Sequence, residues 1–483
     1  MNIVWLKRDL RLQDHEPLNQ CELSKDEYQI IYIFEPSVIK YPDTSLRHLQ
    51  FIYHSILEMN EKLKPFNREI LMMQGECLDV FKDLINQSQV KNIYSYQESG
   101  IPLTYKRDIK LKEFFKNNNI RWNEYQRDGI ERGINNRRGW DKRWFSTMNK
   151  EIIDNKYSKS KNSTLSNKFE LDKNLLKKLN NYPKYYKKPG EIEAHKTLKS
   201  FTSKRGFNYS KFISKPTESR ISCGRVSPHL AWGNISVKQA YQFVKNHPNY
   251  IRNKRSFNGL LTRLKWRCHF IQKFEVECEI EKLCVNRAFE TLERSNNKEF
   301  IKAWKEGKTG LPLVDANMRC LIKTGWINFR MRAMLVSIFC HHMDCDWREG
   351  VYHLANLFLD YEPGIHFSQF QMQAGTTGIN AIRIYNPIKQ SYDHDEDGLF
   401  IKKWVPELKE YDKENIHEPW KTPPLILELM KNKSKYPEPI IDVDEASRAA
   451  RQKIWSHRKL KSCLLYTSPS PRDRTRSRMP SSA

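Results

Sequence analysis

The apolar and polar positions divide the chain into regions of different character. In residues 1–125, short apolar runs rich in β-branched and aromatic residues alternate with segments of helical period. The runs lie at 4–6, 29–34, 69–73, 92–96 and 120–125. Alternating strands and helices predict a parallel, doubly wound sheet. No G-x-G-x-x-G sequence follows the first run, so the dinucleotide-binding fingerprint is absent.

The pattern changes after residue 125 and again after residue 195. Residues 126–195 are rich in Lys, Asn, Tyr and Ser and show little periodicity, which predicts a long basic connector. Residues 196–462 place apolar side chains at helical period without sustained strand alternation, so we predict an all-α domain. The clearest helical faces lie at 195–201, 237–245, 257–282, 297–305, 318–338 and 348–359.

The final segment, 463–483, differs from the rest of the chain. It is rich in Ser, Pro and Arg, a composition that predicts disorder. Two interpretations remain open: a basic tail for nucleic acid, or translated vector sequence, which we favour. Leaving out its four Arg and one Asp lowers the net charge from +26 to +23, so the charge argument does not depend on this segment.

The net charge favours a polyanionic partner such as DNA or RNA. Lysines spread evenly over all surfaces would give the same total, and charge alone does not separate the two interpretations.

The ten cysteines contain no C-x-x-C pair, which argues against a zinc ribbon or an iron–sulfur cluster and fits a reducing compartment. No run of about 18 apolar residues predicts a membrane span. The chain enters a strand at once, leaving no room for a signal or transit peptide, so we expect a cytoplasmic monomer.

Two stretches carry residues suited to chemistry. Residues 346–387 crowd carboxylates, a histidine, amides and glycines together, where a segment that only filled a core would be more apolar. The stretch 224–233 combines Gly224, Arg225 and Ser227 with a helix start, and these groups suit a pyrophosphate. The same residues fit an ordinary helix N-terminus, with Ser227 as the cap and Pro228 in the first turn.

Four segments together resemble the photolyase/cryptochrome family. They lie at 4–15, 224–233, 304–332 and 346–387, and the resemblance covers nearly the whole chain except the final segment. It implies an N-terminal α/β domain at 1–125, a connector at 126–195 and a helical FAD-binding domain at 196–462. It also allows for an antenna pigment of unidentified chemistry in the α/β domain, near Glu98 and the loop 97–103.

The resemblance assigns residues to the FAD site. It implies that Asp360 pairs with Arg332 beside the flavin ring and that Glu362 bonds the flavin or ribose edge. His366 falls where the family varies the side chain facing flavin N5, and its protonation would tune the flavin; the alternative is that His366 caps the loop and faces elsewhere. The implied cofactor-binding residues are Tyr209, Gly224, Arg225, Ser227, Trp326, Arg332, Asp360, Glu362 and His366. Cys223 stands where the family places a hydroxyl residue.

The chain departs from the family pattern in its electron relay. Many members pass electrons to the flavin through three tryptophans, and Trp347 matches the middle one. Phe370 and Arg294 stand at the other two positions and are poor hole carriers, so this relay is interrupted. Trp404 and Trp326 remain candidates for another route.

The lesion side departs as well. Trp266 matches the aromatic residue that packs against a flipped pyrimidine dimer, and its alternative role is ordinary packing on a helix face. Arg263 replaces the family's usual acidic residue, Phe329 a common polar residue and Ala333 a common Met. The implied DNA- and lesion-binding residues are Arg263, Trp266, Arg267 and Arg330, and the implied catalytic residues are Trp266, Arg332, His366 and Trp347.

These observations predict a light-driven flavoprotein that repairs cyclobutane dimers in UV-damaged DNA, a deoxyribodipyrimidine photo-lyase using FAD. The interrupted relay and altered lesion pocket keep a second hypothesis open, a cryptochrome-like blue-light photoreceptor without repair activity. A DNA-binding protein with a vestigial flavin site is a third. The adjacent histidines expected of a (6-4) photolyase are missing, because Asn328-Phe329 stand there.

Overall fold

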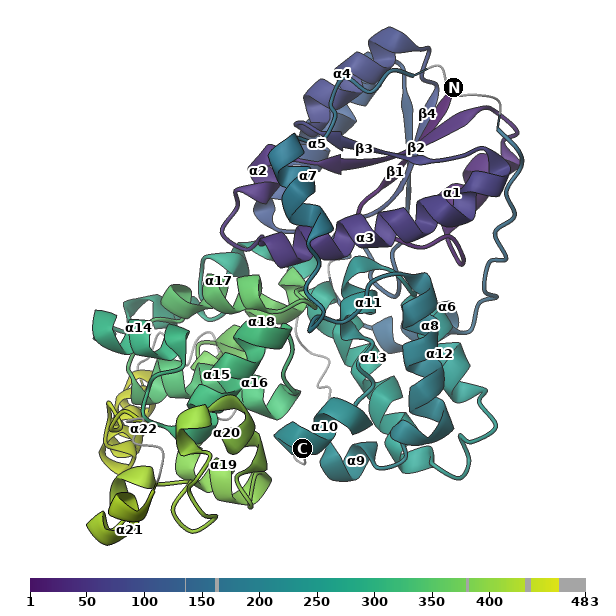
Figure 1. Cartoon of the computed structure of the whole chain (residues 1–483). Helices are drawn as coiled ribbons and strands as arrows, with labels where there is room; N and C mark the ends of the chain where they lie inside the picture. The colour runs from purple at the N-terminus through teal and green to yellow at the C-terminus, as the bar shows by residue number, and fades with distance from the viewer. Residues whose placement is uncertain (135, 161–164, 379–381, 431–435, 460–483) are drawn as a thin grey trace.

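The computed structural model describes residues 1–134, 136–160, 165–378, 382–430 and 436–459 (Figure 1). Five parallel strands form one sheet in the order β3-β2-β1-β4-β5. Their bounds are β1 Asn2–Leu6, β2 Tyr28–Phe34, β3 Ile70–Gln74, β4 Asn92–Tyr96 and β5 Arg121–Tyr125. This order confirms the predicted doubly wound sheet, with the change of direction between β1 and β4. The predicted disorder of 463–483 lies outside the described residues.

Alternation along β1 explains how the sheet is covered on both faces. Successive side chains of a strand point to opposite faces. Val4 and Leu6 pack into one core with α1 (Glu16–Leu23) and α3 (Leu46–Leu63), whereas Ile3 and Trp5 pack into another with α4 (Cys77–Gln87) and α5 (Pro102–Asn117). Figure 1 shows these helix pairs on opposite sides of the sheet.

The segment predicted as a connector contains two helices that the sequence pattern did not predict. They are α6 (Trp140–Met148) and α7 (Lys173–Asn180). Each buries a narrow apolar face, Trp140, Trp144 and Met148 in α6 and Leu179 in α7. Charged neighbours hide these faces in a polar sequence, so a composition-based prediction reads them as loop.

The rest of the described chain is helical, as predicted. Its longer helices are α8 Glu191–Ser200, α12 Val237–Lys245, α13 Lys254–Val276, α14 Lys298–Glu306, α15 Pro312–Thr324, α16 Phe329–Ser337, α17 Trp347–Leu357, α18 Pro363–Ala374, α19 Pro387–His394 and α22 Val443–Arg458. The shorter ones are α9 Tyr209–Phe212, α10 Pro216–Ser222, α11 Ser227–Trp232, α20 Leu399–Trp404 and α21 Pro424–Leu429, and the α/β region adds the short helix α2 Pro36–Ile39.

The segment 318–338, predicted as one helix, forms two helices in the structure. The apolar pattern over 318–338 is continuous, but α15 ends at Gly325, which takes a left-handed conformation with φ 70°. Glycine adopts this conformation without steric cost and commonly ends helices. The chain restarts as α16 after Asn328. The break places Trp326 and Asn328 in an irregular segment that lines a cavity.

The α/β and helical regions are joined by close backbone contacts. Gly233 ends α11 with φ 79°, and its backbone lies against that of Arg8 and Asp9. Leu10 N donates to Trp232 O at 3.1 Å, and Tyr361 Oη donates to Asp43 at 2.7 Å. No helix within the described ranges is long and apolar enough to cross a bilayer.

Candidate functional site

The helical region encloses a cavity of about 290 Å³. Its walls come from α9, α11, α13, α16, α17 and α18 and from the segment between α15 and α16. Twelve of the sequence-predicted site residues line it: Tyr209, Gly224, Arg225, Ser227, Arg263, Trp266, Arg267, Trp326, Arg332, Asp360, Glu362 and His366. Segments more than 150 residues apart therefore converge on one space.

One end of the cavity carries positive charge without a counter-ion. The Arg225 guanidinium lies 3.8 Å from the centre of the Trp326 ring, and no acceptor contacts it among the residues that the structure describes. Nearby Arg220 donates to Trp326 O at 3.0 Å, and Arg205 donates only to backbone carbonyls and Ser200. Burial, together with the charge of Arg220, lowers the pKa of Arg225 to about 9. An anion in this end of the cavity would relieve that cost.

The loop before α11 supports the same reading. Arg225 has φ 57°, a left-handed conformation uncommon for a non-glycine residue. The predicted alternative, Ser227 as helix cap, is wrong: the N-cap position is Val226, and no side chain caps the helix there. Gly224 is packed closely, since an added Cβ would lie 3.0 Å from Leu260 Cδ1.

Two carboxylates with buried side chains, Asp360 and Glu362, also line the cavity. The predicted pair is present, with Arg332 Nη2 donating to Asp360 Oδ2 at 2.8 Å. Glu362 Oε2 accepts hydrogen bonds from Arg127 Nη2 at 2.8 Å and Arg267 Nη2 at 2.9 Å. Burial alone would raise the pKa of Glu362, but the two guanidinium groups outweigh it and hold that pKa below the usual 4.5.

Arg127 and Arg267 revise the sequence interpretation. Arg267 was expected with the lesion-binding residues, but it is buried on α13, where it bonds Glu362 and Leu230 O. Arg127 was not predicted at all, because it comes from the segment after β5, 235 positions from Glu362. The sequence could have indicated that a partner was needed, because a buried Glu362 requires a cation nearby. It could not indicate which cation that is.

The cavity walls hold unsatisfied polar atoms. Among the described residues, six buried side-chain atoms without partners belong to residues of the lining: Arg267 Nη1, Asn328 Oδ1, Asp360 Oδ1, Glu362 Oε1, Gln369 Oε1 and Gln373 Oε1. Leaving such an atom unpaired costs about 1–3 kcal/mol. Donors, acceptors and an unpaired cation in an otherwise apolar cavity fit a flavin dinucleotide, whose ring edge and hydroxyls hydrogen-bond and whose diphosphate is anionic.

His366 lines the cavity from α18, and it does not cap the loop. Its Nε2 contacts Val351 O at 2.8 Å, and because a carbonyl only accepts, Nε2 carries the proton. Burial, with a smaller contribution from Arg332, lowers the pKa of His366 to about 4. The ring is therefore neutral at pH 7 and is held in one orientation by α17.

The mouth of the cavity is aromatic and cationic. The Arg263 guanidinium lies 4.4 Å from the Trp266 ring and 6.0 Å from the Phe329 ring. Phe329 is 42% exposed, so this group faces solvent in part. Arg330 was predicted here, but it does not line the cavity and lies against Tyr385, with its guanidinium 5.8 Å from that ring.

Trp347 also lies outside the cavity lining. It is buried at the start of α17, and Phe370 lies in the lining where the sequence comparison placed the flavin-proximal tryptophan. Arg294 donates to Cys340 O at 2.6 Å and to Asp344 at 3.1 Å, as part of a structural contact. The interruption of the three-tryptophan relay at these two positions stays a prediction from the sequence.

Comparison with known proteins agrees with this geometry. Residues 2–130 match the family described as DNA photolyase, and residues 260–456 match the FAD binding domain of DNA photolyase. A deoxyribodipyrimidine photo-lyase of Buchnera aphidicola is 27% identical over 93% of this chain and 95% of its own length. A cryptochrome DASH of Synechocystis is 25% identical over 93% of this chain and 97% of its own length.

Solved structures show the same fold. An archaeal photolyase from Sulfolobus tokodaii, crystallised with two FAD molecules, superposes with a TM-score of 0.78 at 26% identity, covering 94% of this chain and all of that one. A class III photolyase from Agrobacterium tumefaciens gives a TM-score of 0.83 at 23% identity, covering 95% and 98% of the two chains. The similar proteins thus include both photolyases and a cryptochrome at about the same identity.

Proposed function

Because the chain belongs to the photolyase/cryptochrome family and carries its FAD-binding domain, we propose that it is a light-driven DNA repair enzyme, a deoxyribodipyrimidine photo-lyase that opens cyclobutane dimers in UV-damaged DNA. The observation that carries the proposal is the cavity itself. It joins an unpaired, half-buried cation, a set of unpaired buried polar atoms and a partly exposed aromatic mouth in one space. A photoreceptor needs the first two features, whereas a repair enzyme also needs a place for the lesion.

The chain's own residues would hold and tune the cofactor. Arg225 would balance the charge of the diphosphate, and the unpaired oxygens of Asp360 and Glu362 would accept hydrogen bonds from the flavin or its ribityl chain. His366 would stay neutral beside the ring. Bound FAD would supply light absorption and the electron for ring opening. The apolar part of the lining would exclude water from the site.

The mouth would receive the lesion. Photolyases take the damaged base out of the DNA stack into a pocket over the cofactor. Trp266 and Phe329 offer aromatic faces on which an unstacked base can pack. Arg263 can donate hydrogen bonds to that base but cannot accept any. A net charge of +26 would strengthen binding to phosphates in a salt-dependent way.

A repair assay tests the proposal. The full chain, reconstituted with FAD and fully reduced, is mixed with an oligonucleotide carrying one cyclobutane thymine dimer and exposed to blue light. We expect light-dependent recovery of the undamaged oligonucleotide, with none in the dark. Trp266→Ala should weaken dimer binding about tenfold or more, since a stacked base contributes about 1–3 kcal/mol, while Trp266→Phe should retain most of it. No repair by the reduced, illuminated wild type would overturn the proposal.

A second function has specific support. Phe370 and Arg294 interrupt the usual relay, and Arg263 stands where an acidic residue is usual, which favours a photoreceptor that does not repair. In that case illumination would change the oligomeric state or the partners of the protein while dimers persist. Size-exclusion chromatography in the dark and under blue light, run beside the repair assay, separates the two functions.

A further inference from the structure

A second crevice lies at the carboxyl ends of the strands, where the sheet order changes direction. Open α/β sheets commonly bind ligands at this place. The crevice has a volume of about 90 Å³, against about 290 Å³ for the flavin cavity, and Trp232 and Pro363 of the helical region close its far side. The photolyase from Sulfolobus tokodaii holds two FAD molecules, which implies a light-harvesting cofactor in that protein.

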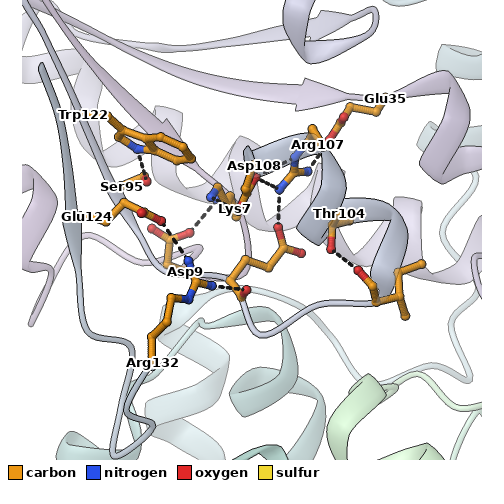
Figure 2. A network of polar contacts seen from close by, with 12 residues as sticks. Lys7, Asp9, Glu35, Ser95, Thr104, Arg107, Asp108, Trp122, Glu124 and Arg132 are labelled. Carbon is orange, nitrogen blue, oxygen red and sulfur yellow. Dashed lines mark hydrogen bonds and ion pairs between the residues drawn. The ribbon is translucent and has the colours of Figure 1, made fainter. Parts of the chain in front are cut away.

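An ion cluster built around Arg107 forms part of the wall of the crevice (Figure 2). Arg107, on α5, donates to Glu35 at 2.5 Å, to Glu98 at 2.7 Å and to Asp108 at 2.7 Å. Lys7, directly after β1, donates to Asp108 Oδ2 at 3.3 Å. Glu35 follows β2 and Glu98 follows β4, so two strand ends meet at the Arg107 guanidinium, and the end of β1 joins them through Lys7 and Asp108. Lys7, Glu35, Glu98 and Arg107 therefore face cluster partners instead of a ligand, and Arg8, which also lines the crevice, stacks on Trp232 and donates to Tyr361 O.

The cluster is buried as well as closed. The side chains of Lys7, Glu35, Glu98, Arg107 and Asp108 are between 6% and 13% exposed. Burial opposes the charge of Glu98, but Arg107 outweighs it and lowers the pKa of Glu98 to about 2. A buried pair that loses one partner is strongly destabilised. A ligand entering here would have to break these contacts and replace them.

The two spaces differ in what they leave unsatisfied. Of the buried side-chain atoms without partners in the described ranges, six belong to residues lining the flavin cavity and none belongs to a residue lining the crevice. A site prepared for a polar ligand leaves atoms that the ligand pairs. The flavin cavity meets that criterion and the crevice does not.

We infer that the crevice at the carboxyl ends of β1, β2 and β4 is too small and too firmly held by the Arg107 cluster to accept a second chromophore, so that one FAD is the sole light-absorbing cofactor of each chain. Glu98, which the sequence placed near an antenna pigment, then has a structural role. The inference rests on the proposed function only for the identity of the first cofactor.

A count of bound flavin tests the inference. The full chain is saturated with FAD, freed of unbound ligand and denatured, and released flavin is measured per mole of protein. We expect one FAD in the wild type. Two FAD per chain, or a co-purifying chromophore that is not a flavin and absorbs above about 300 nm, would overturn the inference.

Variants show whether a bound flavin lies in the flavin cavity or in the crevice. Arg225→Glu reverses the charge of the flavin cavity, and we expect it to bind at least tenfold less FAD at subsaturating ligand. If Arg225→Glu retains one tightly bound FAD that is lost when Arg107→Met and Glu98→Gln are added, the crevice binds flavin and the inference is wrong. If the triple variant does not fold, the number of FAD molecules bound per wild-type chain still decides the inference. Absence of dimer repair by a protein holding one FAD would count against the proposed function and leave this inference standing.

Discussion

Arg225 is a residue whose environment favours a ligand over the protein alone. Its guanidinium is half-buried against Trp326 with no acceptor among the described residues, and burial and Arg220 lower its pKa to about 9. A buried charge without a partner destabilises a fold. In contrast, Arg205 donates to several backbone carbonyls, so it contributes to the folded state of the protein without ligand.

Arg225→Gln should therefore separate stability from binding. We expect the free energy of unfolding of the apoprotein to rise or to change by less than about 0.5 kcal/mol, the usual range for a substitution that removes no favourable contact. FAD affinity should fall at least about tenfold, which corresponds to about 1.4 kcal/mol. Urea denaturation and calorimetric titration measure the two quantities. Arg205→Gln, the matched control, should lower apoprotein stability; a destabilised Arg225→Gln apoprotein with unchanged FAD affinity would contradict the assignment.

Glu362 tests the opposite case, a buried charge that the fold depends on. Glu362→Ala leaves Arg127 and Arg267 without their shared carboxylate, and removing one partner of a buried ion pair costs about 3–5 kcal/mol. Glu131→Ala removes the partner of the half-exposed Arg143 and should cost under about 1 kcal/mol. Urea denaturation of both variants measures the difference. Equal losses would show that the Glu362 contacts are not desolvated.

At the scale of elements, the sequence predicts best where one physical signal dominates. β1 is a fully buried apolar run and β2 and β4 are nearly so, and all five predicted runs overlap the observed strands, including the partly exposed β5. The helices α6 and α7 were missed because their apolar faces are narrow and lie in a basic segment. The merged prediction over 318–338 failed because apolar spacing continues through a break that Gly325 makes in the backbone.

Gly233 is an element boundary whose importance comes from tertiary contact. It ends α11 in a left-handed conformation, and an added Cβ would lie 2.3 Å from Arg8 O and 2.4 Å from Asp9 Cα. Both atoms are backbone, so neither can move aside without shifting the loop after β1. α11 also contributes Leu230 and Ala231 to the flavin cavity, which couples this contact to the site.

Gly233→Ala should lower the free energy of unfolding by about 2–5 kcal/mol, the sum of about 1–2 kcal/mol for the left-handed conformation and about 1–3 kcal/mol for overpacking. Gly133→Ala is the matched control, because Gly133 has a similar φ of 75° and nothing within 4 Å of the added Cβ. It should cost only the conformational part. Urea denaturation of the two variants isolates the packing contribution, and equal losses would argue against close contact at Gly233.

At the scale of the whole molecule, the site depends on partners that lie far apart in the chain. The segment 346–387 and the loop at 224–227 were identifiable because glycines, carboxylates and cations stand at family-like spacing. The partner of Glu362 was not, because Arg127 lies 235 positions away in a segment without a motif. Local sequence therefore specifies which side chains do chemistry, and the three-dimensional packing specifies which cation neutralises which carboxylate.

The histidines also act together at this scale. Burial lowers the pKa of seven of them to about 3 or about 4: His48, His229, His269, His341, His342, His353 and His366. In the unfolded chain each has a pKa near the usual 6.5. Below pH 6.5 the unfolded state binds protons that the folded state does not, so stability falls as the pH decreases, and the loss ends only below the folded pKa values.

This linkage predicts acid sensitivity that begins well above the range of carboxylates. Each buried neutral histidine contributes up to about 1.4 kcal/mol of lost stability per pH unit below 6.5, so several together exceed the stability of an ordinary domain within one to two units. We expect the melting temperature of the apoprotein to fall steeply between pH 6.5 and 5. His353→Gln, outside the flavin cavity, should reduce the number of protons taken up on unfolding by about one, measured from the pH dependence of urea denaturation. A stability that stays constant down to pH 4.5 would mean that carboxylates such as Glu362, which lose their contribution only as the pH falls through their lowered folded-state pKa values, control acid unfolding instead.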